Sequence, residues 1–206
     1  MKKYMIALLA VLVACAGEKK NEEKAEQQMA TPKPAVENVV EYARTEAGNP
    51  IVQFGTAMGD IEIEVFENEC PIHAQNFLRL IENGFYDDVL FHRVIANFMI
   101  QSGDPTGTGG GGPGYTLEPE PLKYKNLRTY VAMAQSTRGI NGSQFYILVK
   151  DSPHLDNQFT CFARVISGMD VVDAIAKVKT TGNDRPVEPV KIIQARPKAP
   201  PATEGS

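Results

Sequence analysis

Hydrophobic and charged residues alternate strictly in one short segment of the chain. Residues 61–65 place isoleucine or valine at every second position with glutamate between them, the period of a β-strand with one solvated face. An apolar run at 51–54 precedes this segment, and Gly55 and Gly59 mark a turn between the two. The pattern predicts a β-hairpin over 51–66.

Other segments carry apolar residues at helical spacing. Pro71 can open a helix, and the apolar residues that follow share one face until Asn83 and Gly84 end it. A second amphipathic helix is predicted from about Met169 to Val178. Valine and alanine at 36–43 recur with the same spacing and indicate a short helix before the hairpin.

The remaining hydrophobic residues form short runs that are separated by turn residues. Such runs are typical of β-strands, and many short strands with few helices favour a closed antiparallel barrel capped by the helices. The predicted strands cover 91–95, 98–101, 130–134, 144–148 and 160–165. The fold class is therefore mainly β.

The first residues are typical of an export signal. Lys2 and Lys3 precede an apolar run at 5–13. This run is too short for a membrane-spanning helix, which needs about 20 apolar residues. Residues 1–14 are therefore predicted to be a signal peptide that is removed.

The end of this signal is similar to the lipobox of bacterial lipoproteins. The run Leu12-Val13-Ala14-Cys15 matches its pattern, in which the cysteine receives a diacylglycerol and becomes the new N-terminus. Lipid chains on Cys15 would hold a soluble domain at a bilayer. The alternative is an ordinary secretory signal cleaved near Cys15, and both export the protein. We expect a lipid anchor in the cell envelope, on the periplasmic face of the outer membrane. The residue after the cysteine, Ala16 instead of aspartate, favours the outer membrane, and the sequence leaves the inner membrane and the other leaflet open.

Composition divides the rest of the chain into three parts. Residues 15–48 are rich in glutamate, lysine, glutamine and proline, as in a flexible tether. The folded domain is expected at 49–195, and the proline- and alanine-rich residues 196–206 are expected to be a disordered tail. A chain of 206 residues with 43% hydrophobic content suffices for one such domain, with a monomer as the default.

Charge and cysteine content narrow the function without defining it. The net charge is −4 and no basic residues cluster, which argues against a nucleic-acid partner. Apart from Cys15, the cysteines are Cys70 and Cys161. In the oxidising compartment that receives an exported protein, these two cysteines can form a disulfide. Each can instead be a small buried hydrophobic side chain, and the sequence leaves both open.

Three familiar site patterns are incomplete. Gly107, Gly109 and Gly112 match G-x-G-x-x-G, but Pro113 follows where a phosphate-binding helix would begin. The three histidines lack the spacing of metal ligands. Ser143 does not lie in a G-x-S-x-G turn. The sequence therefore predicts no dinucleotide site, no metal and no serine hydrolase.

Three longer segments resemble the signature of the cyclophilins. They read FHRVI at 91–95, FMIQSGDP at 98–105 and NGSQFYI at 141–147, and shorter matches in the same order extend the resemblance over 51–195. The resemblance implies a closed eight-stranded antiparallel barrel capped by two α-helices. It also implies a peptidyl-prolyl cis-trans isomerase that needs no cofactor and acts on proline-containing unfolded or partly folded polypeptides, here those exported with it.

The same resemblance assigns roles to individual residues. Arg93 matches the catalytic arginine, whose guanidinium can bind the substrate carbonyl while the amide loses its resonance. Gln101 and Gln144 match the polar residues that hold the arginine and the substrate backbone. The full set matched to substrate binding is Phe98, Met99, Ala134, Gln135, Gln144, Tyr146, His154, Leu155 and Phe159.

Several positions depart from the usual family residues. Tyr146 stands for a phenylalanine, and Gln135, His154 and Phe159 also differ from the common choices. The departures at Gln135, His154 and Phe159 motivate an alternative from another class, a binding module or chaperone that holds proline-containing segments without useful turnover. Arg93→Ala would remove most of the activity of the enzyme with the fold intact, but it would lower peptide affinity only modestly in the alternative.

Overall fold

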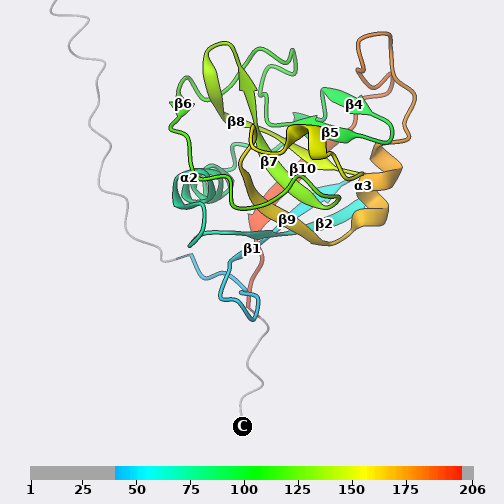
Figure 1. Cartoon of the computed structure of the whole chain (residues 1–206). Coiled ribbons are helices and arrows are strands. Elements are labelled where there is room, and N and C mark those ends of the chain that lie inside the picture. The colour runs from blue at the N-terminus through cyan, green and yellow to red at the C-terminus, as the bar shows by residue number, and fades with distance from the viewer. Residues whose placement is uncertain (1–39, 201–206) are drawn as a thin grey trace, which may run out of the picture. The chain divides into compact units, whose positions relative to one another are not determined.

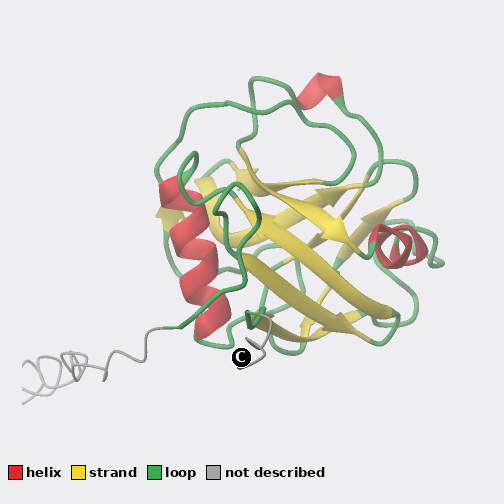
Figure 2. Ribbon diagram, turned by 90° about the horizontal axis from the view of Figure 1, so that it is seen from below, coloured by secondary structure: helices red, strands yellow, loops and turns green. Residues whose placement is uncertain are grey.

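The computed structural model describes residues 40–200, so the predicted signal peptide, Cys15, most of the tether and residues 201–206 lie outside the described residues. The described chain forms a curled antiparallel sheet with an α-helix at each of two opposite sides (Figures 1 and 2). Its strands are β1 Ile51–Thr56, β2 Gly59–Val65, β3 Val89–Leu90, β4 Arg93–Ile95, β5 Met99–Ser102, β6 Thr116–Leu117, β7 Tyr130–Ser136, β8 Gly139–Leu148, β9 Cys161–Ser167 and β10 Lys191–Pro197.

The sheet is open, which corrects the expected closed eight-stranded barrel. Its ten strands pair in the order β3-β10-β1-β2-β9-β7-β8-β5-β4, with β6 added to β8. The end strands β3 and β4 follow one another in the chain and do not pair. Backbone donors in this region bond elsewhere: the Phe91 N–H donates to the Val190 oxygen at 2.9 Å, and the Val94 N–H donates to the Asp184 oxygen at 2.7 Å. The segment before β10 therefore occupies the place where a closing ladder would lie.

Strand β10 is a finding that the hydrophobic pattern does not predict. The register against β1 shifts between Gly55 and Thr56, where an irregularity interrupts the ladder. As a result, Ile192 and Ala195 are both fully buried although they are not an even number of residues apart. A β-bulge thus hides the period of two by which a strand is recognised.

The two α-helices predicted within the domain are confirmed. Helix α2, Pro71–Glu82, begins with the proline and ends before Asn83, as its pattern indicates. Helix α3, Met169–Ile175, ends somewhat before the predicted Val178. Helix α2 buries Phe77 among four aromatic rings of the core, with ring centroids 5.0 to 6.0 Å apart; these rings belong to Phe54, Tyr86, Phe145 and Phe162.

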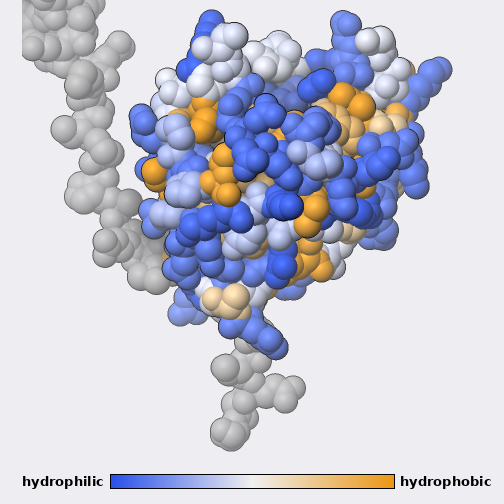
Figure 3. Space-filling model, viewed as in Figure 1, coloured by the Kyte–Doolittle hydropathy of each residue, from blue (hydrophilic) through white to orange (hydrophobic). Residues whose placement is uncertain are grey.

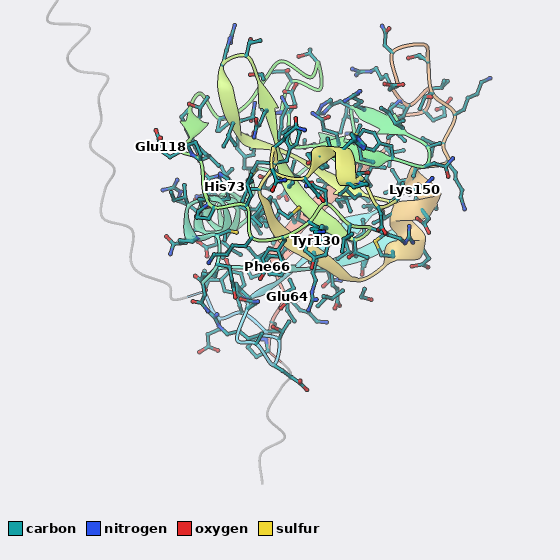
Figure 4. All side chains as sticks on the ribbon, in the orientation of Figure 1. Glu64, Phe66, His73, Glu118, Tyr130 and Lys150 are labelled. Atoms are coloured by element: carbon teal, nitrogen blue, oxygen red, sulfur yellow. The ribbon has the colours of Figure 1, made fainter. Side chains whose placement is uncertain are left out.

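A buried glutamate holds the start of α2. The carboxylate of Glu120 accepts hydrogen bonds from the backbone N–H groups of Ile72 and His73, both at 2.8 Å. The His73 side chain is fully buried and lies beside Glu118, whose backbone oxygen is 3.2 Å from Nε2 (Figure 4). Burial lowers the pKa of His73, against the opposing effect of Glu120. These contacts join α2 to the connection between β6 and β7.

Residues 43–50, here named the strap, pack against the domain although composition predicts tether up to residue 48. The Ala43 N–H donates to the Lys198 oxygen at 2.6 Å, beside the end of β10. Glu64 is 1% exposed and accepts hydrogen bonds from Thr45 at 2.9 Å and Asn49 at 3.0 Å. The helix expected at 36–43 is not present in its described part, residues 40–43.

Two further expectations concern membranes and cysteines. Within residues 40–200, no helix combines the length and hydrophobicity required to cross a membrane. Cys70 and Cys161 are buried free thiols, not a disulfide, and burial raises the pKa of each to about 12. Both are therefore small buried side chains in this structure.

On the face seen in Figure 3, hydrophobic residues form small separate groups among hydrophilic ones.

Candidate active site

The site is built on a row of residues that crosses the sheet from β4 to β9. In the strand register, Arg93 lies opposite Gln101 and Gln101 lies opposite Tyr146. Tyr146 in turn lies opposite Ala132, which lies opposite Cys161. Directly paired residues of neighbouring strands share a face of the sheet. The signature segments are therefore brought together on one face.

This face carries a hydrophobic cluster that is separate from the main core and is here named the outer cluster. Its buried members are Met99, Ala132, Tyr146, Leu148 and Cys161. Its partly buried members are Ile95, Phe98, Tyr124, Tyr130, Leu155 and Phe159. Because these last side chains remain partly accessible, the outer cluster presents an apolar surface that a small apolar group of a ligand can complete.

A pocket of about 390 Å³ opens over the outer cluster. It is lined by Arg93, Phe98, Met99, Gln101, Gly109, Ala134, Gln135, Tyr146, Leu155 and Phe159. The rings of Tyr146 and Phe159 meet edge to face, with centroids 5.8 Å apart, and form one corner. The pocket thus combines apolar walls with one cationic side chain and two amide side chains, a composition suited to an apolar ring attached to a polar backbone.

Arg93 has a partner that the sequence does not indicate. Its side chain is 47% exposed, and its Nε lies 3.4 Å from Oδ2 of Asp184 in the connection between α3 and β10. Asp184 has a positive φ of 59°, and its backbone oxygen is the acceptor for Val94 in β4. One residue therefore contacts both the strand and the side chain of the arginine.

Gln101 lies opposite Arg93 in the sheet, but its side chain bonds another residue. Gln101 donates from Nε2 to Oε1 of Gln144 at 2.9 Å instead. Gln144 donates in turn to the backbone oxygens of Gly109 at 3.0 Å and Gly111 at 2.7 Å. The two glutamines therefore link the pocket to residues 103–112, here named the glycine loop.

Asp104 organises the glycine loop from within. Its fully buried carboxylate accepts backbone hydrogen bonds from Thr106 at 2.7 Å, Thr108 at 3.1 Å and Gly109 at 2.6 Å. It accepts a further one from Gly111 at 3.1 Å. Burial alone would raise the pKa of this carboxyl, but the hydrogen bonds outweigh burial and lower the pKa to about 2. The loop therefore closes around a carboxylate that is negatively charged at neutral pH.

Two glycines of the loop are required by close contacts. Gly103 has φ +90°, and a Cβ there would lie 2.1 Å from the Ser143 oxygen. A Cβ on Gly111 would lie 2.1 Å from Oδ1 of Asp104. These two glycines thus permit the turn and the close approach to β8.

The pocket continues into a groove along the glycine loop. A hollow of about 240 Å³ shares Gln101, Gly109, Ala134 and Gln135 with the pocket. A further hollow of about 370 Å³ adjoins it, and Arg138 lines both hollows. An extended peptide in the pocket therefore has room for neighbouring residues.

The structure brings together the predicted catalytic and substrate-binding residues with two exceptions. Gln144 lines the adjoining hollow and not the pocket. His154 is exposed outside the pocket, with its ring centroid 5.5 Å from that of Phe98. Sequence reasoning missed Gly109, for which the glycine-rich run is a signal, and Asp184, for which no local signal exists.

His92, which directly precedes the arginine, packs under the glycine loop. It is 7% exposed, and neither ring nitrogen has a hydrogen-bond partner among the described residues. Burial lowers its pKa, so the ring is neutral near pH 7. Within residues 40–200, no three histidine, cysteine or acidic side chains converge as metal ligands.

The curled sheet, the two helices and the apolar pocket beside an arginine define a cyclophilin-type isomerase. The chain belongs to this family: the model of the cyclophilin-type peptidyl-prolyl cis-trans isomerases matches residues 51–196. It is a peptidyl-prolyl cis-trans isomerase, an enzyme that acts on proline-containing peptides.

Individual relatives agree with this assignment. The chain is 45% identical to peptidyl-prolyl cis-trans isomerase-like 1 of Aspergillus oryzae over 151 residues, which cover 70% of this chain and 93% of the relative. It is 40% identical to the isomerase CYP18-2 of Arabidopsis thaliana over 160 residues, covering 75% and 97%. A crystal structure of a Cryptosporidium parvum cyclophilin-type isomerase superimposes with a TM-score of 0.68 at 30% identity, covering 73% and 98%. That protein was also crystallised in the presence of the dipeptide Ala-Pro.

Proposed function

We propose that this isomerase assists the folding of exported proteins, with the pocket over the outer cluster holding the substrate proline and Arg93 acting on the amide. The observation that carries the assignment of the site is the register of Arg93, Gln101 and Tyr146 on one face beside a pocket of about 390 Å³. The substrates are proline-containing segments of unfolded or partly folded polypeptides.

The chemistry requires no covalent step. Rotation about an X-Pro bond is opposed by a barrier of about 18–20 kcal/mol, because amide resonance must be broken. An enzyme lowers this barrier when it binds the twisted amide more tightly than either planar isomer. With the proline ring fixed against Phe98, Met99 and Leu155, the rest of the peptide can rotate relative to it.

Arg93 supplies the differential binding. As resonance is lost, the prolyl nitrogen gains a localised lone pair, and a guanidinium is a permanent cation with several N–H donors. Placed at the rim of an apolar pocket, it stabilises this electron distribution more than that of the planar amide. Its half-exposed side chain contacts Asp184 through Nε and leaves the other guanidinium donors for the substrate.

The test is a proline-isomerisation assay of Arg93→Ala. We expect kcat/KM to fall by about 100- to 1000-fold, with an unchanged melting temperature because the side chain is half exposed. Arg79→Ala is the matched control, since Arg79 is an exposed arginine on α2. Near-normal turnover of Arg93→Ala would refute its assigned role, and loss of turnover with Arg79→Ala would show that the effect is not specific.

The membrane anchor is part of the same proposal and rests on residues 1–16. A positively charged start, a short apolar run and the Leu-Val-Ala-Cys sequence support export followed by lipid attachment at Cys15. A lipid-anchored monomer on the periplasmic face of the outer membrane would act on proteins as they leave the export machinery. Its domain would then be retained in the envelope by acyl chains.

Lipid attachment is tested by feeding producing bacteria a labelled fatty acid. We expect the label on the wild-type protein and its absence from Cys15→Ser, which should also leave the membrane fraction. Cys70→Ala is the control and should keep the label. Separation of inner and outer membranes then tests the location. A cleaved but unlabelled wild-type protein would favour the ordinary secretory signal.

A further inference from the structure

A buried asparagine lies behind the pocket and does not line it. Asn126, in the connection between β6 and β7, is 0% exposed. Its Oδ1 accepts a hydrogen bond from the hydroxyl of Tyr146 at 3.2 Å. Tyr146 is itself only 5% exposed, and its ring lines the pocket. The hydroxyl is thereby directed away from the pocket and into the protein.

The backbone of the same residue holds a second wall of the pocket. Leu155 ends the short 3-10 helix η1, Pro153–Leu155, which is flanked by Ser152 and Asp156. The Ser152 N–H donates to the backbone oxygen of Asn126 at 2.8 Å. The Asn126 N–H donates to Oδ1 of Asp156 at 2.8 Å. Asn126 is therefore bonded to both ends of the helix that carries Leu155.

These contacts matter because Tyr146 brings a polar atom to an apolar cluster. A buried hydroxyl without a partner is costly, so it turns toward any acceptor within reach. Burial raises the pKa of Tyr146, which keeps the hydroxyl protonated and able to donate. The Cys161 thiol also points at Oδ1 of Asn126, at 3.5 Å, from the other end of the residue row.

We propose that Asn126 is a positioning residue of the isomerase: it fixes the Tyr146 wall relative to the Leu155 wall and keeps the tyrosine hydroxyl out of the proline pocket. It acts through these two residues and does not touch the substrate. The inference rests on the proposed role of the pocket as the proline site.

The geometry makes a specific demand on variants. Asn126→Ala removes Oδ1, which accepts from the Tyr146 hydroxyl and the Cys161 thiol, and the 3.4 Å bond from Nδ2 to Asp156. It keeps the backbone bonds to Ser152 and Asp156. The Tyr146 hydroxyl then lacks a partner and competes with the proline for the pocket. Tyr146→Phe removes the hydroxyl, which is the polar group that would compete with the proline for the pocket. The second substitution should therefore rescue the first.

The experiment compares the full chain with Asn126→Ala, Tyr146→Phe and the double variant. The readouts are kcat, KM and the affinity for a short Ala-Pro peptide, together with the melting temperature. We expect Asn126→Ala to lower kcat/KM about tenfold, chiefly through KM, and the double variant to return to within about threefold of wild type. Leu127→Ala, which alters the exposed neighbour, is the control and should be unchanged.

Several outcomes would overturn the inference. If the loss of kcat/KM in the double variant equals the product of the losses in the two single variants, Asn126 only stabilises its loop. If the wild type neither binds nor isomerises the peptide, the role of the pocket fails and this inference fails with it.

A second measurement does not depend on folding of the variants. In wild type, the hydroxyl proton of Tyr146 should exchange slowly with water in NMR spectra, because it is bonded to a buried acceptor. Rapid exchange would contradict the contact to Asn126.

Discussion

At the scale of single residues, Asp184, the ionic partner of Arg93, is separated from it by 91 positions in the chain. Asp184 and Arg93 are each nearly half exposed, with 42% and 47% of the side-chain surface accessible. An exposed ion pair of this kind contributes about 0.2–1 kcal/mol. Its value to the enzyme is therefore to bias the orientation of the guanidinium and not to stabilise the fold.

Asp184→Asn should accordingly lower kcat/KM by at most about fivefold, the kinetic equivalent of 1 kcal/mol. The difference from wild type should shrink as salt is added, because screening weakens the pair in the wild type. Assays at low and high ionic strength check this, with Asp151→Asn as the exposed control. A loss that is independent of salt would show that Asp184 acts through the loop backbone instead.

The sequence predicts some of these residues and not others for a physical reason. Arg93 and Gln101 lie in contiguous segments whose spacing already encodes two paired strands, so their proximity follows from local pattern. Asp184 and Asn126 reach the site only through connections whose course depends on the tertiary fold. Tyr146 is predicted as a wall of the pocket, but the destination of its hydroxyl is decided by a loop with no pattern of its own.

At the scale of elements, the glycine loop depends on one carboxylate. Asp104 is the common acceptor for backbone groups from Thr106 to Gly111, and these bonds lower its pKa to about 2. In the unfolded chain an aspartate titrates near about 3.9. The pKa in the folded state is lower than this. Ionised Asp104 therefore contributes its full stabilisation above about pH 4 and loses it as the pH falls toward 2.

Asp104→Asn should therefore lower the free energy of unfolding at pH 6, and the difference from wild type should diminish between about pH 4 and pH 2. Urea unfolding at a series of pH values measures it, and Asp170→Asn at an exposed position is the control. The variant should also lose activity, since Gln144 binds this loop. A constant difference across the pH range would contradict the assigned charge.

Element prediction succeeds where periodicity is undisturbed. Helix α2 shows a clean apolar face and a proline at its start, and β2 alternates strictly, so both are predicted nearly to the residue. Strand β10 fails because of its bulge, and β6 fails because two residues cannot display a period. The open sheet could not be predicted, since closure depends on which distant segment bonds the backbone around Phe91.

At the scale of the whole molecule, the strap is joined to the sheet by a buried acid. Burial alone would raise the pKa of Glu64, but hydrogen bonds from Asn49, Arg164 and Thr45 outweigh it and the pKa is lowered. The Arg164 contact is short, with Nε 2.6 Å from Oε2. Glu64 thus remains charged and connects the strap to β2 and β9.

Glu64→Gln should lower the free energy of unfolding by roughly 1–3 kcal/mol, because it leaves Arg164 unpaired and the strap less well bonded. Isomerase activity should be unchanged, since none of these residues lines the pocket. Urea unfolding with a parallel activity assay tests both statements, and Glu188→Gln at an exposed position is the control. Reduced activity at full stability would reveal a connection between strap and pocket.

The hydrogen bond from Ala43 to Lys198 places the two borders of the folded unit side by side. A unit whose borders meet can be carried inside a surface loop of a host protein without forcing the host's flanking segments apart. It also tolerates circular permutation, in which a short linker joins the natural borders and new ends are opened in an exposed turn. We therefore expect this domain to fold when it is inserted into a surface loop of another protein.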